Sequence, residues 1–197
     1  MDLIIQHKNL GSRQRQKAMI LEAMLDEVLD RGLHDAPLSR VASRCGRSAS
    51  IIYKYFPTKD ELIHALYDRI QETKNGVLVE GVIEEMSNRE AFMQVWKNCY
   101  RFSCKYPREA KFLDQYENSR LSNSVPINPR RYSHQNLLSL ISSLHSCGGY
   151  AQIRDVPSDV VYSLTFGIAA NLAKSGDLLE KDSLEKIADV CWRAISE

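Results

Sequence analysis

The chain of 197 residues is 44% hydrophobic and 26% charged, an ordinary composition for a globular protein that buries a substantial core. Its longest weakly polar run, residues 163–173, is too short to cross a bilayer, and no N-terminal apolar block precedes a small-residue cleavage site, so we expect a cytoplasmic protein without a membrane partner. The net charge is +1, but residues 1–59 carry 10 basic and 6 acidic side chains, an excess that fits binding to a polyanion.

Helical periodicity dominates the chain, and alternating strand patterns bounded by hairpin turns are absent, which predicts an all-α fold. The first helix is marked by a continuous apolar stripe and ends at Gly32, because glycine commonly terminates helices. The stripe consists of Ile20, Leu21, Met24, Leu25, Val28 and Leu29. A second helix starts at Pro37, a favoured first helical residue, and Gly46 ends it.

The stretch 51–56, Ile-Ile-Tyr-Lys-Tyr-Phe, has the β-branched and aromatic content of a strand. Its flanks favour a short helix instead. Ser48 can cap such a helix by accepting a hydrogen bond from a backbone N–H, and Pro57 disfavours helical geometry at the residue before it. Two short helices joined by a glycine turn after a longer first helix predict a helix-turn-helix.

The short helix would be amphipathic, with Ile52 and Phe56 on an apolar face that must be held by packing. The opposite face is polar and is formed by Ser50, Tyr53 and Lys54. Small residues at the start of a helix suit base edges in a major groove, and Tyr53, Lys54 and Lys59 have the reach for phosphates. The alternative is a solvated face on a small helical core.

The remaining helices are predicted from capping residues and from the helix-breaking residues between them. Thr58 and Glu61 have the spacing of a capping box, which starts a helix at Lys59 that continues into the 70s. Further helices are predicted between breaks rich in Asn, Pro, Gly and Ser. They cover residues 89–105, 107–119, 130–146, 157–175 and 182–196, and residues 121–129 are predicted to be a loop.

The run from Ile20 to Leu62 resembles the DNA-binding domain of the tetracycline-repressor (TetR) family of bacterial transcriptional regulators. The matching residues are Ala23, Gly32, Val41, Ala42, Gly46, Ser48, Tyr53, Tyr55, Phe56, Lys59 and Leu62. Their order and spacing over about 45 residues are specific. The resemblance implies a helix-turn-helix DNA-binding domain at residues 1–59 and a larger helical domain at residues 60–197 that dimerises and often holds an inducer.

The resemblance also implies roles for individual residues. Recognition-helix positions that touch bases or phosphates in the family are occupied here by Ser48, Ala49, Ser50 and Tyr53. Tyr55 and Lys59 match positions that contact the DNA backbone, and Ser39 matches a position that can reach a base. To these we add Lys54, which has the reach for a phosphate, and Arg47, which stands where a small apolar residue is usual.

Several positions depart from the family pattern or stay open. Pro37 replaces the usual Thr or Ser and loses a hydroxyl that commonly contacts phosphate. Ile51 either contacts a thymine methyl group or packs inward. The basic residues ahead of the first helix form either a frayed terminus or an arm with one phosphate contact. They are Lys8, Arg13, Arg15 and Lys17.

The larger domain offers candidates for a dimer interface. Residues 157–175 contain small side chains that allow a partner helix to approach closely, namely Gly167, Ala169, Ala170 and Ala173. The last helix carries an apolar stripe of Leu184, Ile187, Ala188, Cys191 and Ile195. These two helices are candidates for a four-helix interface in a homodimer, although such a stripe can also be monomer core.

Aromatic residues on two consecutive helices are candidates for an inducer pocket, although an aromatic stripe can also be simple core. The candidate ligand-binding residues are Phe92, Trp96, Tyr100, Phe112 and Tyr116. Trp96 and Tyr116 are preferred because their polar tips could orient a ligand. The compound itself is not identified by the sequence.

Enzyme and metal hypotheses find little support. The five cysteines are odd in number and scattered without a CxxC pair, and His134 and His145 lie too far apart along one helix to bind one metal. We therefore predict no catalytic residues, no metal and no cofactor.

The leading hypothesis is a repressor that binds a palindromic operator in double-stranded DNA as a homodimer and leaves it when a small-molecule inducer binds. It would work in the bacterial cytoplasm and associate with the nucleoid when bound to DNA. The alternative is a thiol-responsive regulator, or a helical interaction protein without an inducer pocket.

Overall fold

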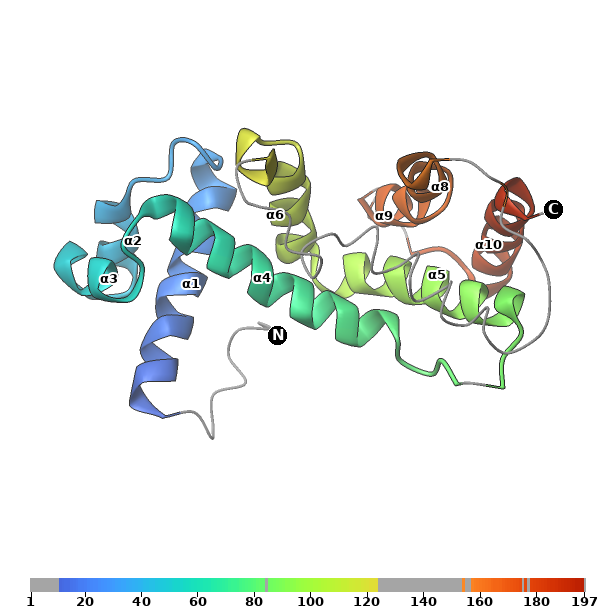
Figure 1. The fold of residues 1–197 in the computed structure, drawn as a ribbon, viewed down its shortest axis with the longest axis horizontal. Helices are drawn as coiled ribbons and strands as arrows, with labels where there is room; N and C mark the ends of the chain where they lie inside the picture. The colour runs from blue at the N-terminus through green and yellow to red at the C-terminus, as the bar shows by residue number, and fades with distance from the viewer. Residues whose placement is uncertain are drawn as a thin grey trace. The chain divides into compact units, whose positions relative to one another are not determined.

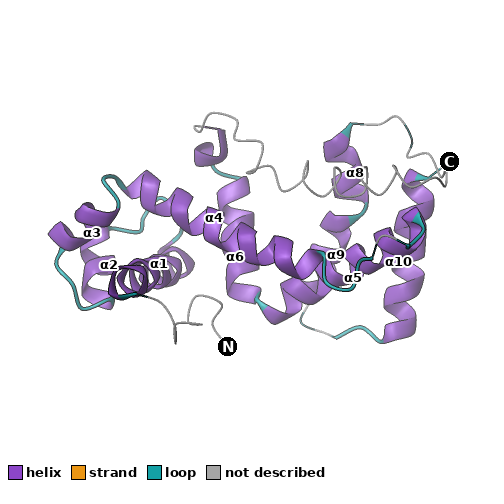
Figure 2. Ribbon diagram, turned by 60° about the horizontal axis from the view of Figure 1, so that its bottom comes forward, coloured by secondary structure: helices purple, strands orange, loops and turns teal. Residues whose placement is uncertain are grey.

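The structure is a computed structural model that describes residues 11–83, 85–123, 154, 157–174, 176 and 178–196. These residues fold into helices and connecting loops, which confirms the all-α prediction (Figures 1 and 2). The chain divides into two compact units. Unit 1 comprises residues 1–73 and 108–126, and unit 2 comprises residues 74–107 and 127–197.

Unit 1 contains the helix-turn-helix, confirmed by α1 (Ser12–Arg31), α2 (Leu38–Arg44) and α3 (Ala49–Tyr55). The stretch 51–56 is therefore helical, as its flanks predicted, and ends before Pro57. α4 (Lys59–Leu78) begins where the capping residues predicted and passes from unit 1 into unit 2 after Thr73. α6 (Pro107–Glu117) and the short 3-10 helix η2 (Arg120–Asn123) complete unit 1, except for Pro107.

The core of unit 1 is built from the apolar faces that the sequence predicted. Met24, Leu25 and Val28 of α1 are fully buried, as are Val41 of α2 and Ile52 of α3. Full burial of such a side chain stabilises the fold by about 1.5 to 3 kcal/mol. α2 packs against both α1 and α3, so the three helices form one compact cluster around the start of α4 (Figure 1).

The two predicted N-caps have different outcomes. Thr58 caps α4 as expected, because its Oγ1 accepts a hydrogen bond from the Glu61 N–H at 3.1 Å. Ser48 occupies the N-cap position of α3 in extended geometry, but its hydroxyl pairs with the Ser50 hydroxyl at 2.8 Å instead of with a backbone N–H. The prediction of a side-chain cap by Ser48 is thus wrong, because a second serine hydroxyl two residues away competes for it.

A buried carboxylate joins α1 to α2. The Glu27 side chain is fully buried, and three guanidinium groups surround it. Its Oε1 lies 3.0 Å from Arg31 Nε and 2.8 Å from Arg40 Nε, and its Oε2 lies 2.6 Å from Arg44 Nε. Burial alone would raise the pKa of Glu27, but the hydrogen bond from Arg44 and the charges of Arg40 and Arg44 lower it below its ordinary value.

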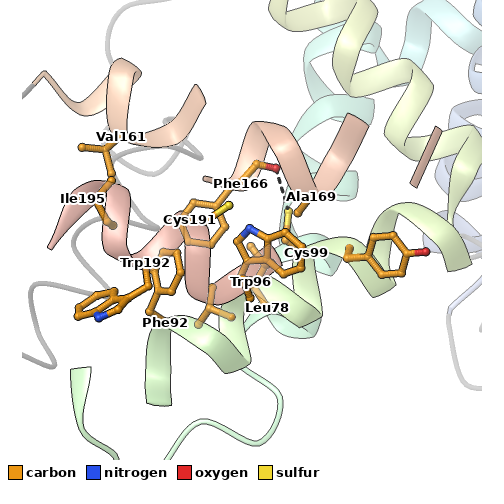
Figure 3. Packing of buried hydrophobic residues seen from close by; sticks show 13 residues of the cluster. Leu78, Phe92, Trp96, Cys99, Val161, Phe166, Ala169, Cys191, Trp192 and Ile195 are labelled. Atoms are coloured by element: carbon orange, nitrogen blue, oxygen red, sulfur yellow. Dashed lines mark hydrogen bonds between the residues drawn. The ribbon is translucent and has the colours of Figure 1, made fainter. Parts of the chain in front are cut away.

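Unit 2 is built around α5 (Asn88–Lys105), which packs against α9 (Phe166–Lys174) and α10 (Lys181–Ile195). Figure 3 shows the apolar cluster at its centre, where the ring of Phe92 lies between those of Phe166 and Trp192 at centroid distances of 5.5 and 5.2 Å. α8 (Ser158–Leu164) contributes Val161 to the same cluster. The capping box of Ser87 and Glu90 fixes the start of α5.

The single helix predicted over residues 157–175 is wrong, because the chain breaks at Thr165 into α8 and α9. Thr165 is fully buried, and its carbonyl accepts a hydrogen bond from the indole N–H of Trp96 at 3.0 Å. Its hydroxyl donates to the Val161 carbonyl at 2.6 Å. The bond from Trp96, a residue far away in the chain, thus meets the chain at the point where the two helices separate.

The other helices agree with their predicted ranges to within about two residues at each end. The predicted helix at residues 130–146 lies outside the described residues. Of the predicted loop at residues 121–129, the first three residues belong to η2 and the rest lie outside the described part of the chain.

Glu27→Gln tests the buried carboxylate. At neutral pH we expect the free energy of unfolding to fall by about 1 to 3 kcal/mol, because three guanidinium groups lose their charged partner. The pKa of Glu27 is lowered in the folded protein, so its contribution is complete above the ordinary value of 4.5 and disappears as the pH falls through the lower folded value. Urea unfolding at a series of pH values should therefore show the two proteins converging below pH 4.5.

Glu72→Gln is the matched control, because Glu72 is 75% exposed and pairs with Arg69 at 3.4 Å. It should change the unfolding free energy by less than about 0.5 kcal/mol. A difference between Glu27→Gln and wild type that stays constant from neutral to acidic pH would mean that the charge of Glu27 is not what stabilises the α1–α2 contact.

Candidate DNA-binding surface

The polar face of α3 is exposed, as the helical wheel predicted. Tyr53 is 51% exposed and Lys54 and Ser50 are exposed, whereas Ile52 is fully buried on the opposite face. Arg47 and Ser48 are exposed just before α3, Ala49 is half-buried in its first turn, and Ser39 is exposed on α2. The geometry is that of a short helix clamped on one side and presenting hydroxyl, phenol and ammonium groups on the other.

The start of this face carries two coupled hydroxyls. Because Ser48 and Ser50 bond to each other, each hydroxyl has a defined position before any ligand arrives. A hydroxyl both donates and accepts hydrogen bonds, so the pair can meet either kind of base-edge group. Ile51 is half-buried, so the choice between an inward and a DNA-facing role stays open.

Tyr55 is joined to α1 by a hydrogen bond that sequence reasoning missed. Its hydroxyl donates to Gln16 Oε1 at 2.6 Å across 39 residues of chain. A phosphate oxygen only accepts hydrogen bonds, so a phosphate at Tyr55 must compete with Gln16 for the same proton. No local pattern marks Gln16, because its partner is determined by how α1 and α3 pack.

Lys59 is anchored at the start of α4. Its ammonium donates to the His34 carbonyl at 2.7 Å, in the connection between α1 and α2. Partial burial lowers the pKa of Lys59, against the opposing charges of Asp60 and Asp35. An ammonium has three N–H donors, so two further donors can serve a phosphate while the third holds the loop.

The start of α1 lies beside the end of α3. The Lys17 ammonium sits 5.7 Å from the centre of the Phe56 ring, a cation–π distance, and Arg13 and Arg15 are exposed. The prediction that Arg13, Arg15 and Lys17 precede the first helix is wrong, because α1 begins at Ser12, and Lys17 is thereby brought next to the end of α3. Lys8, the remaining basic residue of this segment, lies outside the described residues.

The five candidate ligand-binding residues divide between the units. Phe92, Trp96 and Tyr100 are buried in unit 2, where the Trp96 indole N–H bonds to Thr165 and the Tyr100 hydroxyl accepts a hydrogen bond from the Leu179 N–H at 3.0 Å. Phe112 and Tyr116 are buried on α6 in unit 1. The pocket they were predicted to line stays a prediction.

Tyr116 belongs to a polar cluster between α4 and α6. Its hydroxyl lies 2.7 Å from His64 Nδ1, and its ring stacks on that of Tyr67 at 4.1 Å. The Tyr67 hydroxyl accepts a hydrogen bond from the buried Gln71 amide at 2.9 Å. The polar tip of Tyr116 is therefore used within unit 1, which sequence spacing did not indicate.

The burial of the cysteine thiols determines how readily they could react in a redox-sensing function. Cys45 and Cys191 are buried, and burial raises the pKa of both thiols, which disfavours the reactive thiolate. Cys99 is buried with its Sγ 3.9 Å from the Phe166 carbonyl (Figure 3). Cys147 lies outside the described residues.

Among the residues that the structure describes, no group of three or more His, Cys, Asp or Glu side chains is placed to hold a metal ion. Nor is any helix described here long and apolar enough to cross a membrane.

A helix-turn-helix whose second short helix exposes its polar face is the architecture of the helix-turn-helix class of DNA-binding proteins. Comparison with family models specifies the class further. Residues 20–66 match the model described as "Bacterial regulatory proteins, tetR family", and residues 88–196 match the model described as "Tetracyclin repressor-like, C-terminal domain". Together these matches cover well over half of the chain, which therefore belongs to the TetR family of helix-turn-helix transcriptional regulators.

Individual relatives agree with the family. An HTH-type transcriptional regulator of Haemophilus influenzae is 26% identical over 172 residues, which is 84% of this chain and 88% of that protein. The nucleoid occlusion factor SlmA of Haemophilus ducreyi is 27% identical over 118 residues, 58% of this chain and 57% of that protein. The crystal structure of a TetR-family regulator from Haemophilus influenzae superposes with a TM-score of 0.73 at 23% identity, over 95% of this chain and all of that one, which shows a shared fold.

Tyr53→Ala tests the exposed face of α3. Because Tyr53 is half exposed, its removal should leave the circular dichroism spectrum unchanged while weakening operator binding by about tenfold, or about 1.4 kcal/mol. Fluorescence anisotropy with labelled DNA measures the affinity. Met19→Ala, at a 43% exposed residue of α1, is the control and should bind as wild type. Collapse of the helical signal in Tyr53→Ala would instead show a structural role.

Proposed function

We propose that the protein is a repressor that binds a palindromic operator as a homodimer and is released by a small-molecule inducer. Family membership makes it a transcriptional regulator. The observation that carries the finer proposal is the construction of α3, which buries Ile52 and Phe56 and leaves its polar face open to DNA. We assign DNA binding to residues 1–59, and dimerisation and inducer binding to residues 60–197.

The proposed contacts divide by chemistry. Short side chains at the start of α3 and on α2 suit base edges in the major groove, and they are Ser39, Ser48, Ala49 and Ser50. Longer cationic and phenolic side chains suit phosphates, and they are Arg47, Tyr53, Lys54, Tyr55 and Lys59. Lys59 supports this division, because its anchored ammonium stands in the first turn of α4, where free N–H groups and the helix dipole favour an anion.

A homodimer is proposed because one short recognition helix reads too few base pairs for specificity, whereas a two-fold dimer presents two. Within the apolar stripe of α10, Ala188, Cys191 and Ile195 are buried inside unit 2, whereas Leu184 and Ile187 are half-buried and stay candidates for the interface. The exposed apolar residues of the same helices are better candidates. They are Val160 and Leu164, one turn apart on α8, and Val190 on α10.

Inducer binding is proposed for the aromatic residues on α5 and α6. A ligand releases DNA if it binds more tightly to a conformation whose recognition helices do not match the half-site spacing, because the population then shifts to that conformation. The partners that follow are double-stranded DNA, a second copy of the chain and a small molecule. Phe92, Trp96, Tyr100, Phe112 and Tyr116 remain the proposed pocket residues.

Selection of binding sites from random double-stranded DNA tests the operator. We expect a palindrome with half-sites about one helical turn apart. Affinity for the selected site should fall steeply with salt, with log K decreasing by about 0.9 per phosphate contact for each unit of log salt concentration. Recovery of random sequences with uniform affinity would remove the claim of sequence-specific binding.

The double change Val160→Lys and Leu164→Lys tests the dimer. Placing two like charges on the outer face of α8 should raise the dimer dissociation constant at least about tenfold, because an apolar contact is replaced by buried charge. Sedimentation equilibrium measures it. Leu178→Lys, at an 81% exposed residue, is the control and should not affect assembly. An unchanged dimer in the double variant would place the interface elsewhere.

A further inference from the structure

The first observation is a row of carboxylates on α1. Glu22, Asp26 and Asp30 follow one another at intervals of four residues, so they project from one side of the helix. Two arginines from distant parts of the chain meet this row. Arg108 of α6 pairs with Glu22 at 2.9 Å and with Asp26, and Arg44 of α2 pairs with Asp30 and approaches Asp26 at 4.0 Å.

Asp26 is therefore shared between two helices. One of its carboxylate oxygens pairs with Arg108 and the other faces Arg44. The ion pairs run without interruption from the start of α6, across α1, to the end of α2, all within unit 1. Arg108 and Arg44 reach α1 across 82 and 14 residues of sequence, so only tertiary packing brings them together.

These pairs have more effect on orientation than on stability. Arg108, Asp26 and Glu22 are 34%, 41% and 16% exposed, so these pairs are in contact with solvent and contribute less to the free energy of folding than the fully buried Glu27. α6 is held independently by burial of Phe112, Leu113 and Tyr116. Removal of the Arg108 charge should therefore leave unit 1 folded.

α2 is the element most sensitive to such pairs. It has seven residues, and its fully buried side chains, Val41 and Ala42, are small. A helix this short has little stability of its own, so its direction depends on the arginines that tie it to α1. Arg40 and Arg44 both pair with Glu27, and Arg44 additionally meets Asp30 and approaches Asp26. α2 in turn packs against α3, the proposed recognition helix.

Arg108 also stands at a junction in the chain. Pro107 belongs to unit 2, and Arg108 is the first residue of the segment that returns to unit 1. An open groove of about 260 Å³ lies beside the acidic row and is lined by Glu22, Asp26 and Arg44 among others.

We propose that Arg108 is a positioning residue for DNA binding, which sets the orientation of α2 and α3 through Asp26 and Arg44. The inference rests on the proposed operator binding. It goes beyond that proposal in naming the residues through which the helix-turn-helix is held in its binding orientation.

Arg108→Gln is the principal test. We expect affinity for the selected palindrome to fall about five- to tenfold, at the low end of typical coupling between sites. Affinity for random DNA and the slope of log K against log salt should stay unchanged, because no phosphate contact is lost. Arg89→Gln is the matched control, since Arg89 pairs with Asp189 at 2.6 Å in unit 2 and should leave both affinities unchanged.

Two further variants separate positioning from folding. Arg108→Lys retains the charge and should recover most of the palindrome affinity. Asp26→Asn should weaken palindrome binding at least as much as Arg108→Gln, and the two changes together should be less than additive, because they act in one network. Thermal melting of Arg108→Gln should stay within about 4 °C of wild type, as for an exposed ion pair.

Hydrogen exchange supplies a readout that does not need DNA. Backbone amides of α2 and α3 should exchange faster in Arg108→Gln than in wild type, whereas those of α10 should be unchanged. Unchanged exchange in α2 and α3, or equal losses of palindrome and random-DNA affinity, would overturn the positioning role. A wild-type protein that selects no palindrome would instead overturn the proposed function, so the two failures are distinguishable.

Discussion

The proposed DNA binding requires a seven-residue helix to be held in one orientation, and such a helix is too short to be stable by itself. α3 has too few residues to be stable alone, and its N-cap hydroxyl is bonded to Ser50 instead of to the backbone. Its stability therefore comes from burying Ile52 and Phe56 in the core of unit 1. Because one side of α3 is buried, its polar groups lie on the other side, which is the proposed recognition surface.

Ion pairs are the second kind of interaction that holds the helices of unit 1 together. α1 carries four carboxylates that would repel a polyanion if they stood alone, and arginines from α1, α2 and α6 pair with them. The buried member, Glu27, stabilises the α1–α2 contact, whereas the exposed members contribute direction more than free energy. The basic residues that remain on and around α3 are then available for phosphates, in keeping with the excess positive charge of residues 1–59.

In unit 2, residues whose spacing suggested a functional site also form the hydrophobic core. The aromatic residues of α5 and the apolar stripe of α10 were candidates for a pocket and an interface, and both also fill the cluster around Phe92 and Trp96. Trp96 has a further role, since its indole N–H bonds to the carbonyl at which α8 and α9 separate. Val160 and Leu164 of α8 are exposed, and periodicity over residues 157–175 could not distinguish them, because the break at Thr165 separates α8 from α9.

The sequence by itself determined the all-α class, the helix-turn-helix, the start of α4 at its Thr58 cap and the family, because these depend on patterns of spacing along at most about 45 consecutive residues. It also indicated which face of α3 is polar. Only the tertiary structure decided that Tyr55 bonds to Gln16, that Trp96 bonds to Thr165 and that Arg108 meets Asp26. The partners in these pairs are 39, 69 and 82 residues apart. Local patterns carry no information on such pairs, since they form only when helices with fixed apolar faces pack in one arrangement.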